Sequence, residues 1–185
     1  LTSTAFSASV DPVVRQYVDA HPVTGDYGKV WERSYDAAAY KNVDEGEGER
    51  PPAGWTRTFP HPLTSPSGKP DSAFFTLWLR SPFADDYLGR MAAALVDAIQ
   101  LGTGGRTDYL GVSFSSLDLV GHGFGPNSHE VQDMLARLDA TLGALIDHLD
   151  ARVGRGRYVL ALTGDHGVAE IPEQVGSGRT TSRDV

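Results

Sequence analysis

The chain has 185 residues, enough for one domain with a hydrophobic core, and its 40% hydrophobic and 22% charged residues are typical of a soluble globular protein. Its formal net charge of −8 argues against a nucleic-acid partner, and its apolar runs are shorter than the ~20 residues of a membrane-spanning helix. The absence of cysteine excludes disulfides, thiolate metal ligands and thiol nucleophiles, so any metal site must use histidine and carboxylate side chains.

The beginning of the chain is rich in proline, aromatic and turn residues. Asp11, followed by a proline, predicts the N-cap of a short helix. Residues 44–52 predict a charged, exposed loop, and residues 55–70 contain four prolines, which favours irregular wrapping over a sheet. A regular apolar spacing first occurs over about 84–101, where it predicts a helix that Gly102 ends.

From residue 107 the pattern becomes regular. Residues 109–114 predict a short buried strand. Asn127 with Glu130 predicts a capping box, and a long amphipathic helix should follow. Its apolar side would consist of Val131, Met134, Leu135, Leu138, Leu142, Leu145, Ile146 and Leu149, with Asp133 elsewhere and Gly154 and Gly156 as the stop.

A second buried strand is predicted at residues 158–163. Strand, helix and strand over about 108–163 form a parallel βαβ unit, which indicates an α/β fold. In such a sheet, ligands bind beyond the carboxyl ends of the strands. We therefore expect chemistry just after each predicted strand.

Two strings lie at those positions, Asp118-Leu-Val-Gly-His122 and Gly164-Asp165-His166-Gly167. Asp118 and His122, four residues apart, share one side of a helical turn, and the glycines around Asp165 and His166 allow both side chains to face one site. Carboxylate and imidazole groups are zinc ligands. The two pairs together predict metal binding, although either string alone could be a structural turn.

The other histidines and the tryptophans are not expected to bind a ligand. His21 and His61 should be solvated or packing residues, and His129 and His148 should be surface residues of the long helix. The tryptophans, at positions 31, 55 and 78, are expected to be core or wrapping aromatics rather than a ligand cage. Asp85 and Asp86 should begin a helix rather than bind metal.

The stretch from Asp108 through Gly121-His122-Gly-Phe-Gly-Pro126, with Leu162-Thr-Gly-Asp165-His166-Gly-Val, resembles the alkaline phosphatase superfamily. It is most similar to the bacterial alkaline phosphatases related to nucleotide pyrophosphatase/phosphodiesterases, which use a threonine nucleophile. Three flanking strings are also similar to that subfamily: Leu1-Thr-Ser-Thr, Arg57-Thr-Phe-Pro-His-Pro62 and Ser81-Pro-Phe83.

The resemblance implies part of an alkaline-phosphatase-like sheet with helices on both faces and two Zn²⁺ ions in a complete site. It implies that Asp118 and His122 hold one zinc, and that Asp165 and His166 hold the other. The reaction would be in-line phosphoryl transfer to a threonine, followed by hydrolysis of the phospho-enzyme. The substrate would be a small phosphate ester, with a phosphomonoester favoured.

The resemblance also implies that the nucleophile and the remaining ligands lie outside this chain. We expect a central fragment, inactive alone, that needs the remaining segments of the same enzyme. Residues 1–107 would be a peripheral, irregular, cap-like segment ending in a core helix, and residues 108–185 would be part of the α/β metallohydrolase core. The parent would be periplasmic or secreted. Alternatives are a phosphodiesterase or nucleotide pyrophosphatase, a sulfatase relative, a phosphonate hydrolase, a noncatalytic metal-binding or interaction module, and Asp/His turns without metal.

Overall fold

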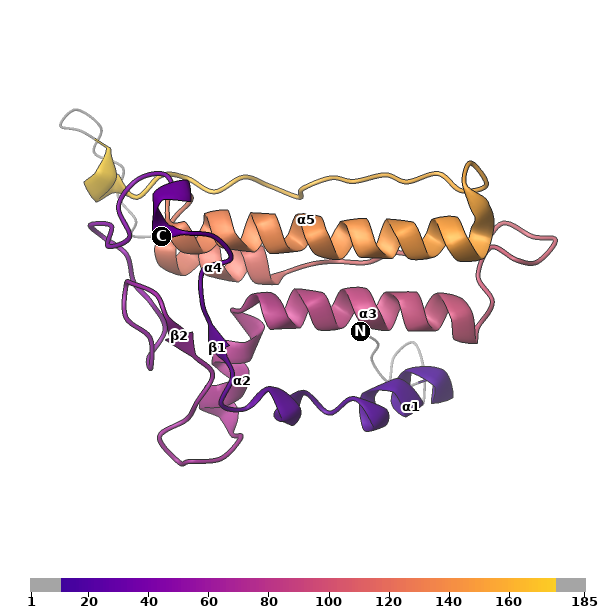
Figure 1. The fold of residues 1–185 in the computed structure, drawn as a ribbon, viewed down its shortest axis with the longest axis horizontal. Coiled ribbons are helices and arrows are strands. Elements are labelled where there is room, and N and C mark those ends of the chain that lie inside the picture. Colours follow the sequence, from indigo (N-terminus) through magenta and orange to yellow (C-terminus); the bar gives the residue numbers. More distant parts are fainter. Residues whose placement is uncertain (1–10, 176–185) are drawn as a thin grey trace.

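The computed structural model describes residues 11–175 and is built around two long helices that run side by side (Figure 1). α3 (Pro82–Ala98) packs along α5 (His129–Leu149), and α1 (Pro12–Ala20) lies against the other side of α3. α4 (Ser116–Phe124) contacts both α3 and α5. Nothing in this described part forms a helix that is both long and apolar enough to span a membrane.

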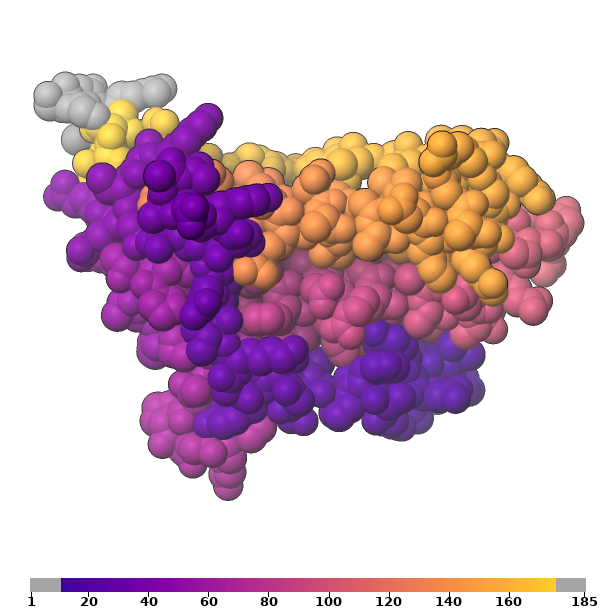
Figure 2. All heavy atoms as spheres, in the orientation of Figure 1, coloured from indigo at the N-terminus to yellow at the C-terminus, as the bar shows by residue number. Residues whose placement is uncertain are grey.

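The sheet among the described residues has two short antiparallel strands. β1 (Val30–Trp31) pairs with β2 (His61–Pro62), with Trp31 opposite His61. The remaining elements are short: η1 (Val23–Asp26), η2 (Ala37–Ala39), α2 (Ser72–Leu79), η3 (Asp150–Gly154) and η4 (Pro172–Gln174). Figure 2 shows α1 on one edge of the molecule and the last described segment along the opposite edge.

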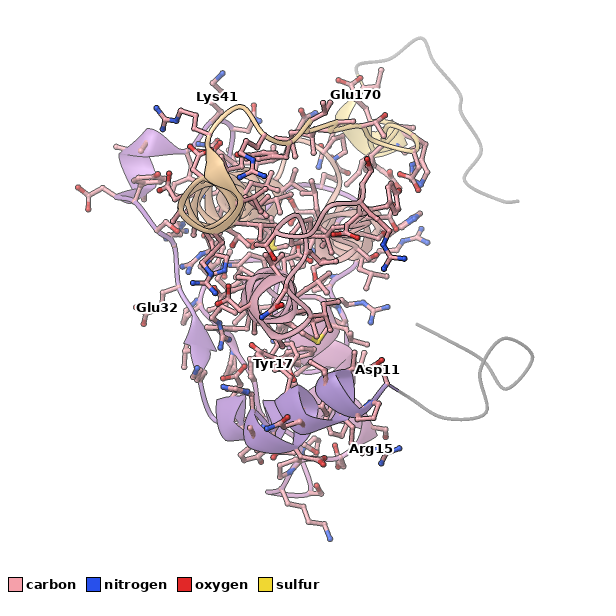
Figure 3. The ribbon with its side chains drawn as sticks, turned by 90° about the vertical axis from the view of Figure 1, so that its right-hand side faces the viewer. Asp11, Arg15, Tyr17, Glu32, Lys41 and Glu170 are labelled. Carbon is pink, nitrogen blue, oxygen red and sulfur yellow. The ribbon has the colours of Figure 1, made fainter. Side chains whose placement is uncertain are left out.

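The two helices predicted in the first part of the chain are present. Asp11 caps α1 as expected, because its carboxylate accepts a hydrogen bond of 2.8 Å from the N–H of Val13. The helix predicted over about 84–101 is α3. Tyr17 of α1 packs edge-on against Tyr87 of α3, with 5.6 Å between the ring centres, and Figure 3 shows Tyr17 on the side of α1 nearest that helix.

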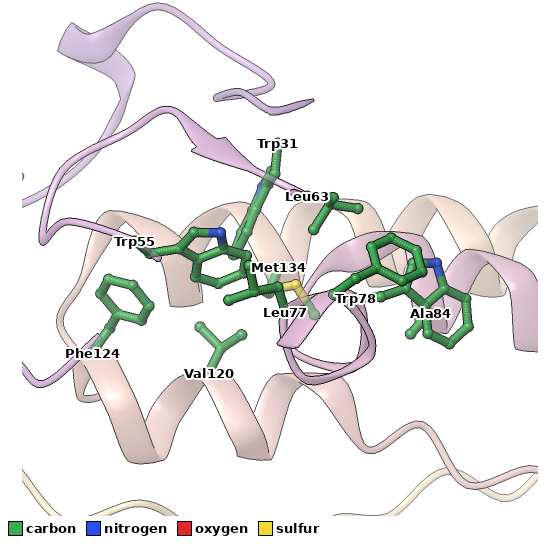
Figure 4. Close-up of a cluster of buried hydrophobic side chains, with 10 residues drawn as sticks. Trp31, Trp55, Leu63, Leu77, Trp78, Ala84, Val120, Phe124 and Met134 are labelled. Atoms are coloured by element: carbon green, nitrogen blue, oxygen red, sulfur yellow. The ribbon is translucent and has the colours of Figure 1, made fainter. Parts of the chain in front are cut away.

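The hydrophobic core joins the segments before and after residue 107 (Figure 4). The three tryptophans, expected as core or wrapping aromatics, are core residues, since all three are buried. They pack with Leu63, Phe74, Leu77 and Ala84 from the first segment and with Val120, Phe124 and Met134 from α4 and α5. The division of the chain into two domains near residue 107 stays a prediction.

Gly89 allows α3 and α5 to approach closely. A Cβ atom at this position would lie 2.4 Å from Cγ2 of Thr141 on α5, which is inside van der Waals contact. The absent side chain therefore sets the distance between the two longest helices of the fold.

The predicted long helix is α5, but its cap differs from the prediction. Ser128, not Asn127, is the N-cap, and its hydroxyl accepts a hydrogen bond of 3.2 Å from the N–H of Val131. Glu130 does not complete a capping box, because its side chain turns into the core. Gly154 has a φ of +105°, so it ends the helical segment as expected.

The segments 109–114 and 158–163, predicted as parallel strands, are extended but belong to no ladder among the described residues. Figure 1 shows the second of them running along α5. Val159 is 96% exposed and Tyr109 is 91% exposed. A strand needs backbone partners on a neighbouring strand, and no other described segment provides them. The string at residues 1–4 lies outside the described residues.

Candidate functional site

α4 directs Asp118 and His122 to the same outer side of the molecule. Its opposite side carries Val120 and Phe124, which are buried in the core. This burial fixes the rotation of the helix, so the carboxylate and the imidazole face away from the core. Asp118 Oδ1 lies 3.4 Å from His122 Nε2.

The start of α4 is held by α3. The N–H of Ser116 donates a hydrogen bond of 3.3 Å to Oδ1 of Asp85, a buried carboxylate in the first turn of α3. Burial raises the pKa of Asp85 above its ordinary value, and hydrogen bonds from Ser116 and Ser115 oppose this. Asp85 therefore belongs to a helix start, as predicted, and it also anchors the helix that carries Asp118.

The second string meets α4 from the extended segment after α5. His166 Nε2 lies 3.6 Å from Asp118 Oδ1 and 3.7 Å from Asp165 Oδ2. The contact depends on Gly121 of α4, since a Cβ there would lie only 3.2 Å from a methyl carbon of Val168. The structure thus brings His122 and His166 to the Asp118 carboxylate, and Asp165 lies beside His166.

The imidazole of His166 is oriented by its own loop. Its Nδ1 lies 3.0 Å from the carbonyl oxygen of Gly167 and donates a hydrogen bond to it, so Nε2 is the unprotonated nitrogen of the neutral ring. This is the arrangement in which a backbone carbonyl orients a metal-binding histidine. The hydrogen bond to Gly167 raises the pKa of His166, and the charges of Asp165 and Asp118 add to this.

The geometry of the group fits a zinc-like ion. Asp118 Oδ1 is shielded from solvent and has no hydrogen-bond partner among residues 11–175, so a cation would satisfy it. Two ligand atoms on one tetrahedral zinc are roughly 3.3 Å apart, close to the 3.4 Å between Asp118 and His122. Within the described residues no three His, Cys, Asp or Glu side chains are grouped to hold one ion. The group therefore provides two pairs of possible ligands, Asp118 with His122 and Asp165 with His166.

The reason for this convergence differs from the prediction. The sequence predicts the two pairs at the ends of two parallel strands. In the structure, one pair lies in a helix and the other lies in a loop that packs on that helix. The assignment of the four residues as metal ligands stays a prediction.

A buried acid–base pair lies behind α4. His61 and Glu130 are both fully buried, and Glu130 Oε1 lies 2.8 Å from His61 Nε2. Burial raises the pKa of Glu130 to about 8 and lowers the pKa of His61 to about 4, so a protonated Glu130 donates to a neutral imidazole near pH 7. The His61 ring lies 5.3 Å from the ring of Phe124, so the pair packs against the core side of α4.

A second buried carboxylate, Asp133, ties the first segment to α5. It accepts hydrogen bonds from Trp31 Nε1 at 2.7 Å, from the Tyr40 hydroxyl at 2.6 Å and from the Ser34 N–H at 2.7 Å. Burial raises the pKa of Asp133, but these hydrogen bonds and one from Arg137 outweigh that effect. The pKa is therefore below its ordinary value, and the carboxylate is ionised. Burial of Tyr40 and its bond to Asp133 raise the pKa of that phenol to about 12.

Several buried polar residues differ from the prediction. The surface position predicted for His129 is wrong, because the residue is buried and its Nδ1 lies 3.2 Å from Asp44 Oδ1. Asp133, predicted off the packed side of α5, and Glu49, predicted in an exposed loop, are also buried. Polar residue types usually indicate exposure, so the pattern contains no signal of their burial. His61 is a packing residue, one of the two roles expected for it.

Comparison with known proteins links this geometry to a family. The model of the type I phosphodiesterase / nucleotide pyrophosphatase family matches residues 7–180. The alkaline phosphatase PhoV of Synechococcus elongatus is 36% identical over 141 residues, which is 76% of this chain and 24% of PhoV. The alkaline phosphatase PafA of Elizabethkingia meningoseptica is 45% identical over 89 residues, which is 48% of this chain and 16% of PafA.

A solved structure agrees with these relatives. The crystal structure of wild-type alkaline phosphatase PafA matches with a TM-score of 0.72 and 31% identity, over 85% of this chain and 30% of that one. The chain spans about a quarter or less of the length of the two curated relatives.

Proposed function

Because the chain belongs to the type I phosphodiesterase / nucleotide pyrophosphatase family, within the alkaline phosphatase superfamily, we propose that it is part of a zinc-dependent phosphate ester hydrolase. Its fold is part of the α/β alkaline phosphatase fold, with several helices and a small sheet. The chain covers a minor share of its relatives, so the activity is proposed for the enzyme that includes this segment.

One observation carries the proposal: the Asp118 carboxylate lies between the imidazoles of His122 and His166. We assign Asp118 and His122 to one zinc ion, and Asp165 and His166 to the other. The remaining ligands and a threonine nucleophile would come from other segments of the same enzyme. Zinc ions in such a site supply Lewis-acid polarisation of phosphoryl oxygens and favour the deprotonated nucleophile.

Other residues of this chain would position the proposed metal ligands. Phe124 and Val120 fix the rotation of α4, Gly121 admits the second loop, and the Gly167 carbonyl sets the imidazole plane of His166. Each contact limits the freedom of a ligand before substrate binds, which lowers the entropy lost on reaching the reactive geometry.

A small phosphomonoester is the favoured substrate, because the relatives are named alkaline phosphatases. A phosphodiester is the second candidate, because the matching family model is that of phosphodiesterases and nucleotide pyrophosphatases. We also propose a periplasmic or secreted location for the enzyme, which is what the resemblance to bacterial alkaline phosphatases implies.

The test is hydrolysis by the intact zinc-loaded enzyme of an aryl phosphate and, separately, of an aryl phosphodiester. We expect a higher kcat/KM for the monoester, and a loss of at least about 100-fold in His122→Ala. His21→Ala, which removes an exposed histidine at the end of α1, is the matched control and should retain activity. An inactive wild-type enzyme, or an active His122→Ala variant, would reject the proposal.

A further inference from the structure

A polar cavity of about 210 Å³ lies between the acidic loop that follows Asn42 and the last described helix, η4, and none of the four Asp/His residues lines it. Its polar lining consists of Asn42, Glu47, Glu49, Asn127 and Gln174. The volume is that of several water molecules, each taking about 30 Å³, so a partly hydrated ion fits. No histidine lines it.

Glu49 is the buried carboxylate of this cavity. It is 2% exposed, and its Oε2 has no hydrogen-bond partner among the residues that the structure describes. Burial raises the pKa of Glu49 to about 7, and the nearby Glu130 adds to this. A buried carboxylate oxygen without a donor is unfavourable unless a cation or a proton satisfies it.

The walls of the cavity are held in place by hydrogen bonds from amide nitrogens. Nδ2 of Asn42 donates to the carbonyl oxygen of Asn127 at 2.9 Å, and Nε2 of Gln174 donates to the carbonyl oxygen of Glu47 at 3.0 Å. Because the nitrogen of each amide is used, the side-chain oxygens of Asn42 and Gln174 remain as acceptors.

Gly46 lets the loop close tightly around this carboxylate. A Cβ at Gly46 would lie 2.4 Å from Oε1 of Glu49 and 2.6 Å from Nε2 of Gln174. The loop is therefore packed against both groups, so the position of Glu49 is fixed by the fold.

We propose that this cavity binds a calcium-sized divalent cation, with the Glu49 carboxylate as its central ligand. Glu47, the amide oxygens of Asn42 and Gln174, and water would complete the shell. Hard oxygen donors in a flexible number and geometry suit Ca²⁺ better than Mg²⁺, which requires a near-octahedral shell. The lack of imidazole in the lining argues against zinc. The bound ion would tie the acidic loop to the segment that carries His166.

The test is calorimetric titration of the intact, zinc-saturated protein with calcium chloride. We expect binding with a Kd on the order of 10⁻⁴ M, and a loss of affinity of more than about tenfold in Glu49→Gln. Glu45→Gln is the matched control, because Glu45 lies in the same loop but is exposed and does not line the cavity; its effect should be below about twofold. His122→Ala should bind calcium like the wild type, which separates this site from the proposed zinc site.

Thermal unfolding shows whether Glu49→Gln loses calcium binding while it remains folded. In EDTA, Glu49→Gln should have a melting temperature equal to or above that of the wild type, because the change removes a buried charge near Glu130. Added calcium should raise the melting temperature of the wild type and of Glu45→Gln, but not that of Glu49→Gln. Equal calcium binding by Glu49→Gln and wild type, or no binding at about 10 mM calcium, would overturn the proposal.

Discussion

The carboxylate of Asp118 lies 3.6 Å from the imidazole Nε2 of His166. Asp118 belongs to α4, which precedes α5 in the sequence, and His166 belongs to a loop that follows α5. The same Oδ1 atom lies 3.4 Å from His122. The Asp118 carboxylate therefore lies beside a histidine of each Asp/His string.

Replacing Asp118 should empty the zinc position that it shares with His122. We expect Asp118→Ala and Asp165→Asn each to lower the zinc content of the intact enzyme by about one ion per molecule, because each change removes a ligand of a different zinc. Elemental analysis after dialysis measures this. Asp139→Asn changes an exposed aspartate of α5 and should keep both ions. Full zinc occupancy in Asp118→Ala would remove Asp118 from the site.

Glu130 and His61 predict how stability depends on pH. The pKa of Glu130 is about 8 in the folded state against an ordinary 4.5, so its contribution to stability is lost as pH rises through 8. The pKa of His61 is about 4 against 6.5, so its contribution is lost as pH falls below 6.5. The two slopes oppose each other between 4.5 and 6.5. Above 6.5 the slope of Glu130 remains, and Glu49 adds to it up to about pH 7.

The free energy of unfolding should therefore fall by about 1–2 kcal/mol between pH 6.5 and pH 8. Asp44 adds to the rise in the pKa of Glu130, and His129 and Arg33 oppose it. Glu130→Gln should remove most of this fall, whereas Glu32→Gln, at an exposed glutamate (Figure 3), should keep it. Urea unfolding of the metal-free protein at both pH values measures the difference. An unchanged pH slope in Glu130→Gln would contradict this account of the pair.

The contact between α3 and α5 predicts opposite effects for two glycines. Gly89→Ala should destabilise by about 1–3 kcal/mol, because the new methyl group would overlap Thr141. Gly143→Ala in α5 meets nothing within 4 Å and should stabilise by up to about 1 kcal/mol. Chemical denaturation of both variants provides the comparison. A neutral Gly89→Ala would mean that the helices are not packed this closely.

The start of α5 predicts which polar residue caps the helix. Ser128→Ala removes the acceptor for the N–H of Val131 and should lower the free energy of unfolding by about 1 kcal/mol. Asn127→Ala should have a smaller effect, because its contact with Asn42 uses the backbone carbonyl. Equal losses in the two variants would favour the capping box that the sequence predicts.

The sequence predicted what depends on short-range spacing. The apolar repeat located α5, Asp11 marked the start of α1, and Asp118, His122, Asp165 and His166 proved to be neighbours. These features follow from periodicity, from capping chemistry and from the family motifs.

Features that depend on long-range contacts could not be predicted. The burial of Glu49, Glu130 and Asp133 depends on partners far away in the sequence, such as His61 and Trp31. The strands expected near Tyr109 and Val159 have the right composition, but a ladder requires a second strand that the described residues do not contain. The composition of a segment indicates whether it favours a strand, but tertiary contacts determine whether the strand forms.

The most direct test of the central claim is an anomalous difference map, at the zinc absorption edge, from crystals of the intact enzyme. We predict two peaks, one roughly 2.0–2.2 Å from side-chain atoms of Asp118 and His122 and one at similar distances from Asp165 and His166. A map of zinc-loaded crystals in which neither pair contacts a peak would contradict this claim.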